Sequence, residues 1–100
     1  MEINEKISAV VTGGASGLGE ATARMLSAMG ANVAIFDLDE NKGLAVSEKI
    51  NSDFYKVDVT DTNSVNQAVL SFLKENDGIQ IAVNCAGIGP AAKTVSRGEP

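Results

Sequence analysis

The stretch that decides the fold of this chain is TGGASGLG, residues 12–19. A short apolar run at residues 7–11 precedes it, which is typical of a strand covered on both faces. After it, apolar residues recur at spacings of three and four, which predicts a helix that begins inside the glycine run. The order of strand, glycine-rich turn and helix therefore predicts a backbone that can approach an anion closely.

The rest of the chain alternates between strand and helix patterns. We expect further strands at residues 33–36, 54–57 and 79–83, with a helix between each strand and the next. This order predicts an α/β fold, a doubly wound parallel sheet with helices on both faces. Such sheets usually have five or more strands, so we expect residues 1–100 to be the N-terminal part of one domain whose C-terminal part is absent. The alternative is a free-standing four-stranded half, which would be only marginally stable.

The helices are predicted from their apolar stripes and their end signals. Thr60 or Asp61 can cap the third helix, and Gly30 is placed to end the first helix in the left-handed conformation. The stripe of the first helix is Leu18, Ala21, Thr22, Met25, Leu26 and Met29, and that of the third helix is Val65, Ala68, Val69, Phe72 and Leu73.

Three glycines of the turn have distinct expected roles. Gly13 permits the tight turn, Gly17 lets a pyrophosphate approach the backbone, and Gly19 allows the helix to pack closely on the sheet. Ser16 can add a hydroxyl donor. The spacing differs from G-x-G-x-x-G, because Thr22 stands where that motif has its last glycine. The stretch is not a P-loop either, since no Gly-Lys-Ser/Thr follows. Glycines also occur in such turns for geometry alone. This run favours a nucleotide site because it follows a buried strand, opens an amphipathic helix and is followed by a strand that ends in an acidic residue.

Asp37 stands at the end of the second predicted strand. From there its carboxylate can accept hydrogen bonds from both hydroxyls of an adenine ribose, which predicts NAD as the cofactor. Repulsion of a 2′-phosphate about 4 Å away is worth about 1 kcal/mol in water and about 4 kcal/mol at a protein surface, so NADP should bind roughly tenfold more weakly or worse. Ala15, Ser16 and Leu38 supply no compensating cation. The alternative is that Asp37 caps the following helix or forms a turn with Asp39.

Two further strand ends would meet the cofactor at the same edge of the sheet. Asp58 could accept from the adenine amine, while Val59 packs on the ring or donates its backbone N–H. The alternative for Asp58 is a turn carboxylate before Thr60. Small residues after the fourth strand let the backbone approach a ribose, and Asn84 can bond the neighbouring strand or loop. Cys85 has no His, Lys or Arg near it in the sequence, which favours a buried, unreactive thiol.

The composition limits the remaining classes of function. The net charge is −5 and Lys and Arg form no cluster, so nucleic acid and membrane surfaces are not expected partners. One cysteine and no histidine exclude an intrachain disulfide, a Cys-rich zinc cluster and a Ser-His-Asp triad. We therefore expect no metal and a cytoplasmic location. The apolar run at residues 7–11 is too short for a signal peptide or a membrane span.

The motifs together resemble those of the short-chain dehydrogenase/reductase (SDR) family, whose members have a Rossmann-like fold. Four motifs occur in the family's order: Thr-Gly-x-x-x-Gly-x-Gly, Asp37, Asp58-Val59 and Asn84-x-Ala86-Gly87. Within the family, residues 13–19 and 81–94 are similar to those of type-2 3-hydroxyacyl-CoA dehydrogenases, which also act as hydroxysteroid dehydrogenases. The resemblance implies cofactor contacts at Gly13, Ser16, Gly17, Leu18, Gly19, Asp37, Asp58, Val59, Cys85, Ala86 and Gly87.

The resemblance also implies an activity. Family members reversibly oxidise a secondary alcohol by hydride transfer, so the implied substrate is a hydroxy or keto compound such as an acyl-CoA. Their acid/base is a tyrosine whose pKa a lysine lowers, and a serine orients the substrate oxygen; we expect this serine and Tyr-x-x-x-Lys beyond Pro100. Tyr55 has Val59 four positions later in place of lysine, so a catalytic role for it is rejected. The full-length protein is expected to form a homo-oligomer, a dimer or a tetramer.

Two alternatives belong to other classes of function. A non-catalytic NAD-binding or NAD-sensing protein could keep the fold, and nothing in the residues up to Pro100 excludes it. A phosphorylated receiver-type α/β domain would need acidic residues at the end of the first strand, where Thr12 and two glycines stand. The residues therefore favour an NAD-dependent SDR enzyme over the receiver domain.

Overall fold

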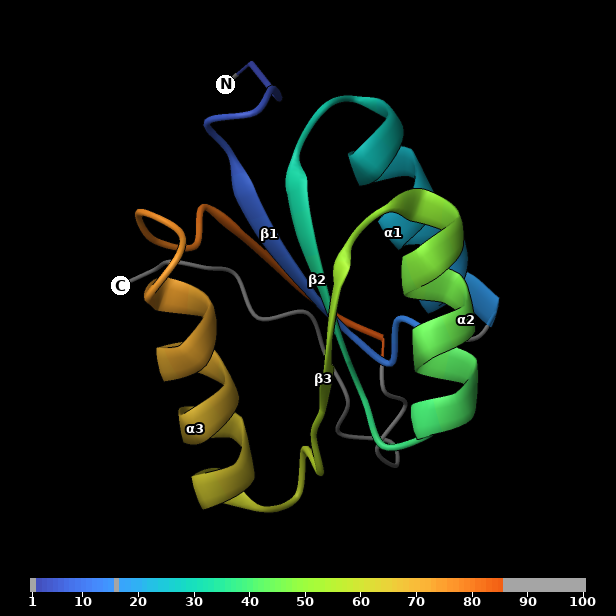
Figure 1. Cartoon of the computed structure of the whole chain (residues 1–100), viewed down its shortest axis with the longest axis vertical. Coiled ribbons are helices and arrows are strands. Elements are labelled where there is room, and N and C mark those ends of the chain that lie inside the picture. The colour runs from blue at the N-terminus through green and yellow to red at the C-terminus, as the bar shows by residue number, and fades with distance from the viewer. Residues whose placement is uncertain (1, 16, 86–100) are drawn as a thin grey trace.

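The structure, a computed structural model, describes residues 2–15 and 17–85. Strands and helices alternate along this part of the chain in the predicted order (Figure 1). The strand ends differ from the predicted ones by one or two residues. The elements are β1 (Ser8–Thr12), α1 (Gly17–Ala28), β2 (Asn32–Asp37), α2 (Glu40–Ile50), β3 (Asp53–Lys56), α3 (Thr62–Leu73) and β4 (Ile81–Asn84).

The described strands form one parallel sheet in the order β3-β2-β1-β4. Helices α1 and α2 cover one face, and α3 covers the other (Figure 1). Ala23 and Leu26 of α1 pack with Val46 of α2 in one buried cluster, while Ala68 and Phe72 of α3 belong to a second cluster. The predicted doubly wound α/β arrangement is therefore confirmed.

The register of the sheet brings the carboxyl ends of the strands level with one another. Thr12 at the end of β1 pairs with Phe36 of β2 on one side and with Asn84 of β4 on the other. Asp37, one residue further along β2, pairs with Lys56 of β3. The residues predicted to bind a nucleotide therefore follow strand ends that share one edge of the sheet.

The buried face of α1 differs from the predicted stripe. Its buried residues are Gly19, Ala23 and Leu26, whereas Leu18 and Met25 are 74% and 56% exposed. Of the predicted stripe, only Leu26 is buried. A side chain at residue 19 would overlap the preceding turn, so the helix packs through its smallest residues and turns most of the larger ones outward. The predicted stripe was wrong because apolar residues on the outer side have the same helical spacing.

The ends of the helices follow their predicted signals. Gly30 has a φ of 100°, and the Ala31 amide donates to the Leu26 carbonyl oxygen at 3.1 Å, which confirms the left-handed end of α1. Of the two candidates for the cap of α3, the Asp61 carboxylate is the one that accepts hydrogen bonds from amides of the first turn.

Helix α3 presents most of its predicted stripe to the sheet. Ala68 and Phe72 are buried, and Val65 and Val69 are partly buried against the same cluster. Leu73, the last residue of α3, is 38% exposed, so its predicted burial is wrong. Among the helices within residues 2–15 and 17–85, none is long and apolar enough to cross a membrane.

Candidate functional site

The glycine turn joins β1 to α1 and lies against the end of β2. Gly13 has a φ of 69°, and its amide donates to the Phe36 carbonyl oxygen at 2.8 Å. A Cβ on Gly14 would lie 3.0 Å from the Ile35 side chain. A left-handed residue and a tight contact with β2 therefore both favour glycine in this turn.

Gly17 and Gly19 serve α1 in different ways. Gly17 is its first residue, has a φ of 52°, and would place a Cβ in open space. A Cβ on Gly19 would instead overlap the carbonyl oxygen of Gly13. Gly19 is thus required by the contact between the helix and the turn rather than by the sheet. Gly17 leaves the start of the helix open to an approaching anion.

The first amides of α1 are the groups that would meet such an anion. They have no partner within the helix, and the start of a helix carries partial positive charge. Leu18, a predicted cofactor contact, lies in this first turn and is largely exposed. Three other predicted contacts, Ser16, Ala86 and Gly87, lie outside the described residues. The contacts of all four with a cofactor stay predictions.

Asp37 ends β2 and reaches the glycine turn. Its Oδ2 accepts a hydrogen bond from the Ala15 amide at 3.0 Å, and its Oδ1 accepts one from the Asp39 amide at 2.8 Å. The turn with Asp39 is therefore present, whereas the cap of α2 is Asp39 itself, which accepts from the Lys42 amide. A carboxylate has about four acceptor positions, so the ribose contact stays a prediction that these bonds do not prevent.

Asp58 lies just beyond β3 and forms a turn with Thr60. Its Oδ1 accepts from the Thr60 hydroxyl at 2.6 Å and from the Thr60 amide at 3.0 Å. These hydrogen bonds hold the pKa of Asp58 below its ordinary value, and the bond from the Thr60 hydroxyl has the larger effect. The turn that was the alternative to an adenine contact is therefore present, and the adenine contact stays a prediction.

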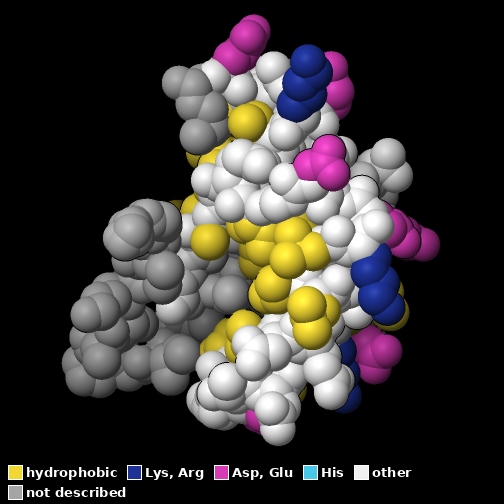
Figure 2. Space-filling view, turned by 90° about the vertical axis from the view of Figure 1, so that its left-hand side faces the viewer, with side chains coloured by type: hydrophobic (Ala, Val, Ile, Leu, Met, Phe, Trp, Pro, Cys, Tyr) yellow, Lys and Arg dark blue, Asp and Glu magenta, His cyan; other side chains and the backbone are white. Residues whose placement is uncertain are grey.

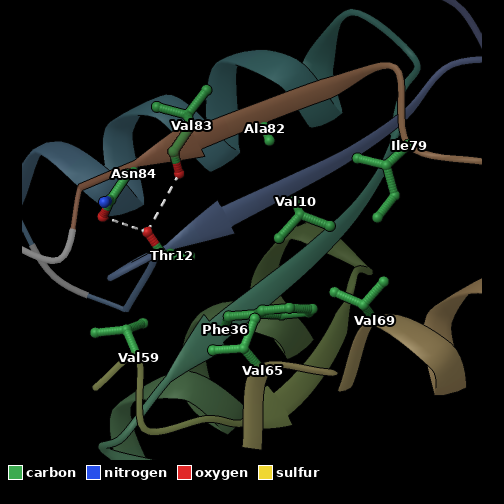
Figure 3. Close-up of a pocket in the computed structure, with 10 residues that line it drawn as sticks. All are labelled: Val10, Thr12, Phe36, Val59, Val65, Val69, Ile79, Ala82, Val83 and Asn84. Carbon is green, nitrogen blue, oxygen red and sulfur yellow. Dashed lines mark hydrogen bonds between the residues drawn. The ribbon is translucent and has the colours of Figure 1, made fainter. Parts of the chain in front are cut away.

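Val59 lines a cavity between the sheet and α3. The cavity has a volume of about 280 Å³, and apolar side chains of β1, β2, β4 and α3 form most of its wall (Figure 3). Hydrophobic side chains also gather in the middle of the molecular surface on the side that carries α3 (Figure 2). The position of Val59 in this wall is compatible with the predicted packing on an adenine ring, which stays a prediction.

The polar end of this cavity ties β4 to β1. The Thr12 hydroxyl donates to Asn84 Oδ1 at 2.7 Å and lies 3.4 Å from the Val83 carbonyl oxygen (Figure 3). The predicted bond between Asn84 and a neighbouring strand is thereby confirmed. Beyond it, the Cys85 amide donates to the Thr12 carbonyl oxygen at 2.9 Å, and the half-buried thiol packs beside the cluster under α1 and α2.

Tyr55 packs between the sheet and α3. Its ring meets those of Phe36 and Phe72 edge to face, with centroids 5.6 Å and 6.4 Å away. Burial, and after it the charges of Asp53 and Glu75, raise the pKa of Tyr55. A tyrosine that acts as a base near neutral pH needs the opposite shift, which agrees with the rejection of a catalytic role.

Two cationic groups near the turn are not evident from the residues that surround the turn in the sequence. Lys42 and Lys49 of α2 line a groove of about 310 Å³ together with Ala15, Gly17 and Glu20. The residues adjacent to the turn and to Asp37 contain no cation, but the tertiary structure brings these two lysines from the second helix. The signal that could have found them is the topology, because consecutive crossovers on one face place α1 and α2 side by side.

Comparisons with known proteins agree on a family. A sequence model of the family described as short chain dehydrogenase matches residues 8–98. The 3-hydroxyacyl-CoA dehydrogenase type-2 of Homo sapiens is 45% identical over 89 residues, which cover 86% of this chain and 34% of that protein. This chain therefore spans about one third of the length of that relative.

Two solved structures share the fold. One is described as a citronellol catabolism dehydrogenase of Pseudomonas aeruginosa; it gives a TM-score of 0.78 at 27% identity and covers 83% of this chain and 37% of its own. The other is described as a ribose-5-phosphate isomerase of Brucella melitensis; it gives a TM-score of 0.78 at 33% identity and covers 85% of this chain and 34% of its own. Their different names show why activity is not inferred from a shared fold.

Proposed function

This chain belongs to the short-chain dehydrogenase family, and on that premise we propose that the full-length protein is an NAD-dependent oxidoreductase. It reversibly oxidises a secondary alcohol by hydride transfer. The relatives named 3-hydroxyacyl-CoA dehydrogenase type-2 favour a 3-hydroxyacyl-CoA or a similar hydroxy compound as the substrate. The observation that carries the choice of NAD is the carboxylate of Asp37 at the end of β2, beside an open glycine turn.

The residues present fit a dinucleotide. A Cβ on Gly17 would lie in open space, and the first amides of α1, which have no partner within the helix, can meet a pyrophosphate; Asp37 offers acceptors to the adenine ribose. Val59 offers an apolar contact to the adenine ring. NAD, when bound, supplies the acceptor for the hydride of the alcohol carbon. The role of the residues in this chain is to bind and orient the adenosine half of the cofactor.

The cofactor preference gives the direct test. We expect the full-length protein to bind NAD roughly tenfold more tightly than NADP, or better, because the Asp37 carboxylate repels a 2′-phosphate. Isothermal titration calorimetry with both cofactors measures the ratio. Asp37→Asn should bring the two affinities together, whereas Asp39→Asn, a matched change at the start of α2, should leave the ratio in favour of NAD. Equal affinities of the wild-type protein for NAD and NADP would contradict the role given to Asp37.

The second candidate function is NAD binding without catalysis. The hydrogen bond between the glycine turn and Asp37 would serve an NAD sensor as well as an enzyme. Tyr55 packs against Phe36 and has a raised pKa, so it does not supply the acid/base of an enzyme. A turnover assay separates the two: we expect the full-length protein to form NADH from NAD and a 3-hydroxyacyl-CoA. Tight binding of NAD with no NADH formed from any hydroxy substrate would favour the sensor. Removal of the 3-hydroxyl from the substrate is the control, since it takes away the group to be oxidised.

A further inference from the structure

The Asp37 carboxylate is bonded to the glycine turn itself. Its Oδ2 accepts from the Ala15 amide at 3.0 Å, two residues before α1 begins at Gly17. At the start of the turn the bond to β2 is a backbone one, from the Gly13 amide to the Phe36 carbonyl oxygen at 2.8 Å. The end of the turn, next to the helix amides that would meet a phosphate, is thus held by a side chain.

This carboxylate can keep its bond to the turn while it accepts hydrogen bonds from a ribose. A carboxylate has about four acceptor positions, two on each oxygen. The Ala15 amide takes one on Oδ2 and the Asp39 amide takes one on Oδ1. The positions that remain match in number the two hydroxyls of a ribose. Asp37 can therefore accept hydrogen bonds from the glycine turn and from a ribose at the same time.

We infer that Asp37 is a positioning residue for the phosphates as well as a ribose contact, because its bond to the Ala15 amide holds the turn in the shape that binds a pyrophosphate. This inference rests on the proposed function, in which the turn binds the pyrophosphate of NAD. Glycine-rich backbone has many accessible conformations, and the apparent affinity of a ligand falls with the fraction of molecules in the competent one. Asp37 thereby contributes to phosphate binding without contact with a phosphate.

Charge and positioning have opposite effects on phosphate binding. Asp37 and a pyrophosphate are both negative, so removal of the carboxylate charge would by itself strengthen the binding of phosphates. Loss of the bond to Ala15 would weaken it. A suitable ligand therefore has phosphates but no ribose hydroxyls. If a variant at residue 37 binds this ligand more weakly than wild type, the cause is the geometry of the turn.

The experiment compares Asp37→Ala with Asp37→Asn in the full chain, with ADP and 2′,3′-dideoxy-ADP as ligands. Both variants are neutral at residue 37, but only the Asn side chain can still accept from the Ala15 amide. We expect D37A to bind dideoxy-ADP roughly five- to tenfold more weakly than wild type, and D37N to regain most of that affinity. Asp39→Ala is the matched control, because its carboxylate caps α2 and makes no hydrogen bond to the described residues of the turn. It should change dideoxy-ADP binding less than roughly twofold.

Amide hydrogen exchange measured by NMR tests the same bond without any ligand. The Ala15 amide should exchange roughly tenfold faster in D37A than in wild type or D37N, while the Gly13 amide keeps its rate because its acceptor is backbone. Thermal melts of each variant separate this local change from loss of the fold. If D37A does not fold, D37N decides: an Ala15 amide protected as in wild type supports the inference, and an unprotected one overturns it.

Two further results would overturn the positioning role of Asp37. One is dideoxy-ADP binding by D37A that is as tight as that of wild type or tighter. The other is unchanged exchange of the Ala15 amide in D37A. A wild-type protein that binds neither ADP nor NAD overturns the proposed function and this inference with it, whereas failure of the inference alone leaves wild-type binding intact.

Discussion

Gly19→Ala should lower the free energy of unfolding by roughly 3 kcal/mol and abolish the binding of NAD. The added Cβ would overlap the carbonyl oxygen of Gly13 and lie 3.0 Å from the Cα of Gly14. Both are backbone atoms, so no rotation of a side chain relieves the overlap, and the turn or α1 must shift. Alanine is favoured over glycine inside a helix by only about 1 kcal/mol, which is smaller than the expected penalty.

Urea unfolding and calorimetry with NAD would measure both effects of Gly19→Ala. The control for stability is Gly17→Ala, which places its Cβ in open space and costs only the strain of a φ of 52°, about 1 kcal/mol. A Gly19→Ala variant that unfolds at the urea concentration of wild type and binds NAD normally would show that the contact between α1 and the turn is not needed.

Phe72→Ala should lower the free energy of unfolding by about 3–5 kcal/mol. Phe72 is 0% exposed and is the largest side chain that α3 buries against the sheet, in the cluster that contains Val10, Phe36 and Val57. Its truncation removes that buried area, leaves a cavity and takes away the edge-to-face contact with Tyr55. Because α3 is the only described helix on this face, the loss should loosen its attachment to the sheet.

The matched control for Phe72→Ala is Leu70→Ala in the same helix. Leu70 is 62% exposed, so its truncation should change the free energy of unfolding by no more than about 0.5 kcal/mol. Both variants place alanine inside α3, and helix propensity therefore contributes a similar small term to each. Equal destabilisation by the two substitutions, measured by urea unfolding, would contradict the assignment of Phe72 to the core.

Features that depend on short stretches of chain could be predicted from the sequence. The apolar run at residues 7–11 predicted a strand, and residues 12–19 predicted a turn and the start of a helix; the structure has β1, the turn and α1 at these places. The alternation of strand and helix patterns predicted a parallel sheet, because a strand that follows a helix crossover usually runs parallel to the strand before it. Asp37 was placed correctly at the end of β2, since its position follows from the apolar run before it.

Burial on α1 could not be predicted in the same way. Leu18, Met25 and Met29 have helical spacing and high hydrophobicity, yet they lie on the exposed side. Glycine and alanine carry little hydrophobic signal, but Gly19 and Ala23 let the helix approach the turn and the sheet. Close approach between two elements is a property of their shapes, which a periodicity of hydrophobic residues does not contain.

The sequence by itself therefore determined the order of the elements, the glycine turn and the acidic strand end, because each depends on residues close together in the chain. Only the tertiary structure decided that the carboxylate of Asp37 accepts from the amide of Ala15, and that Lys42 comes near the turn. These residues are far apart in sequence and meet because parallel strands bring their carboxyl ends to one edge of the sheet. Packing of the backbone, which no local pattern encodes, places one residue within reach of the other.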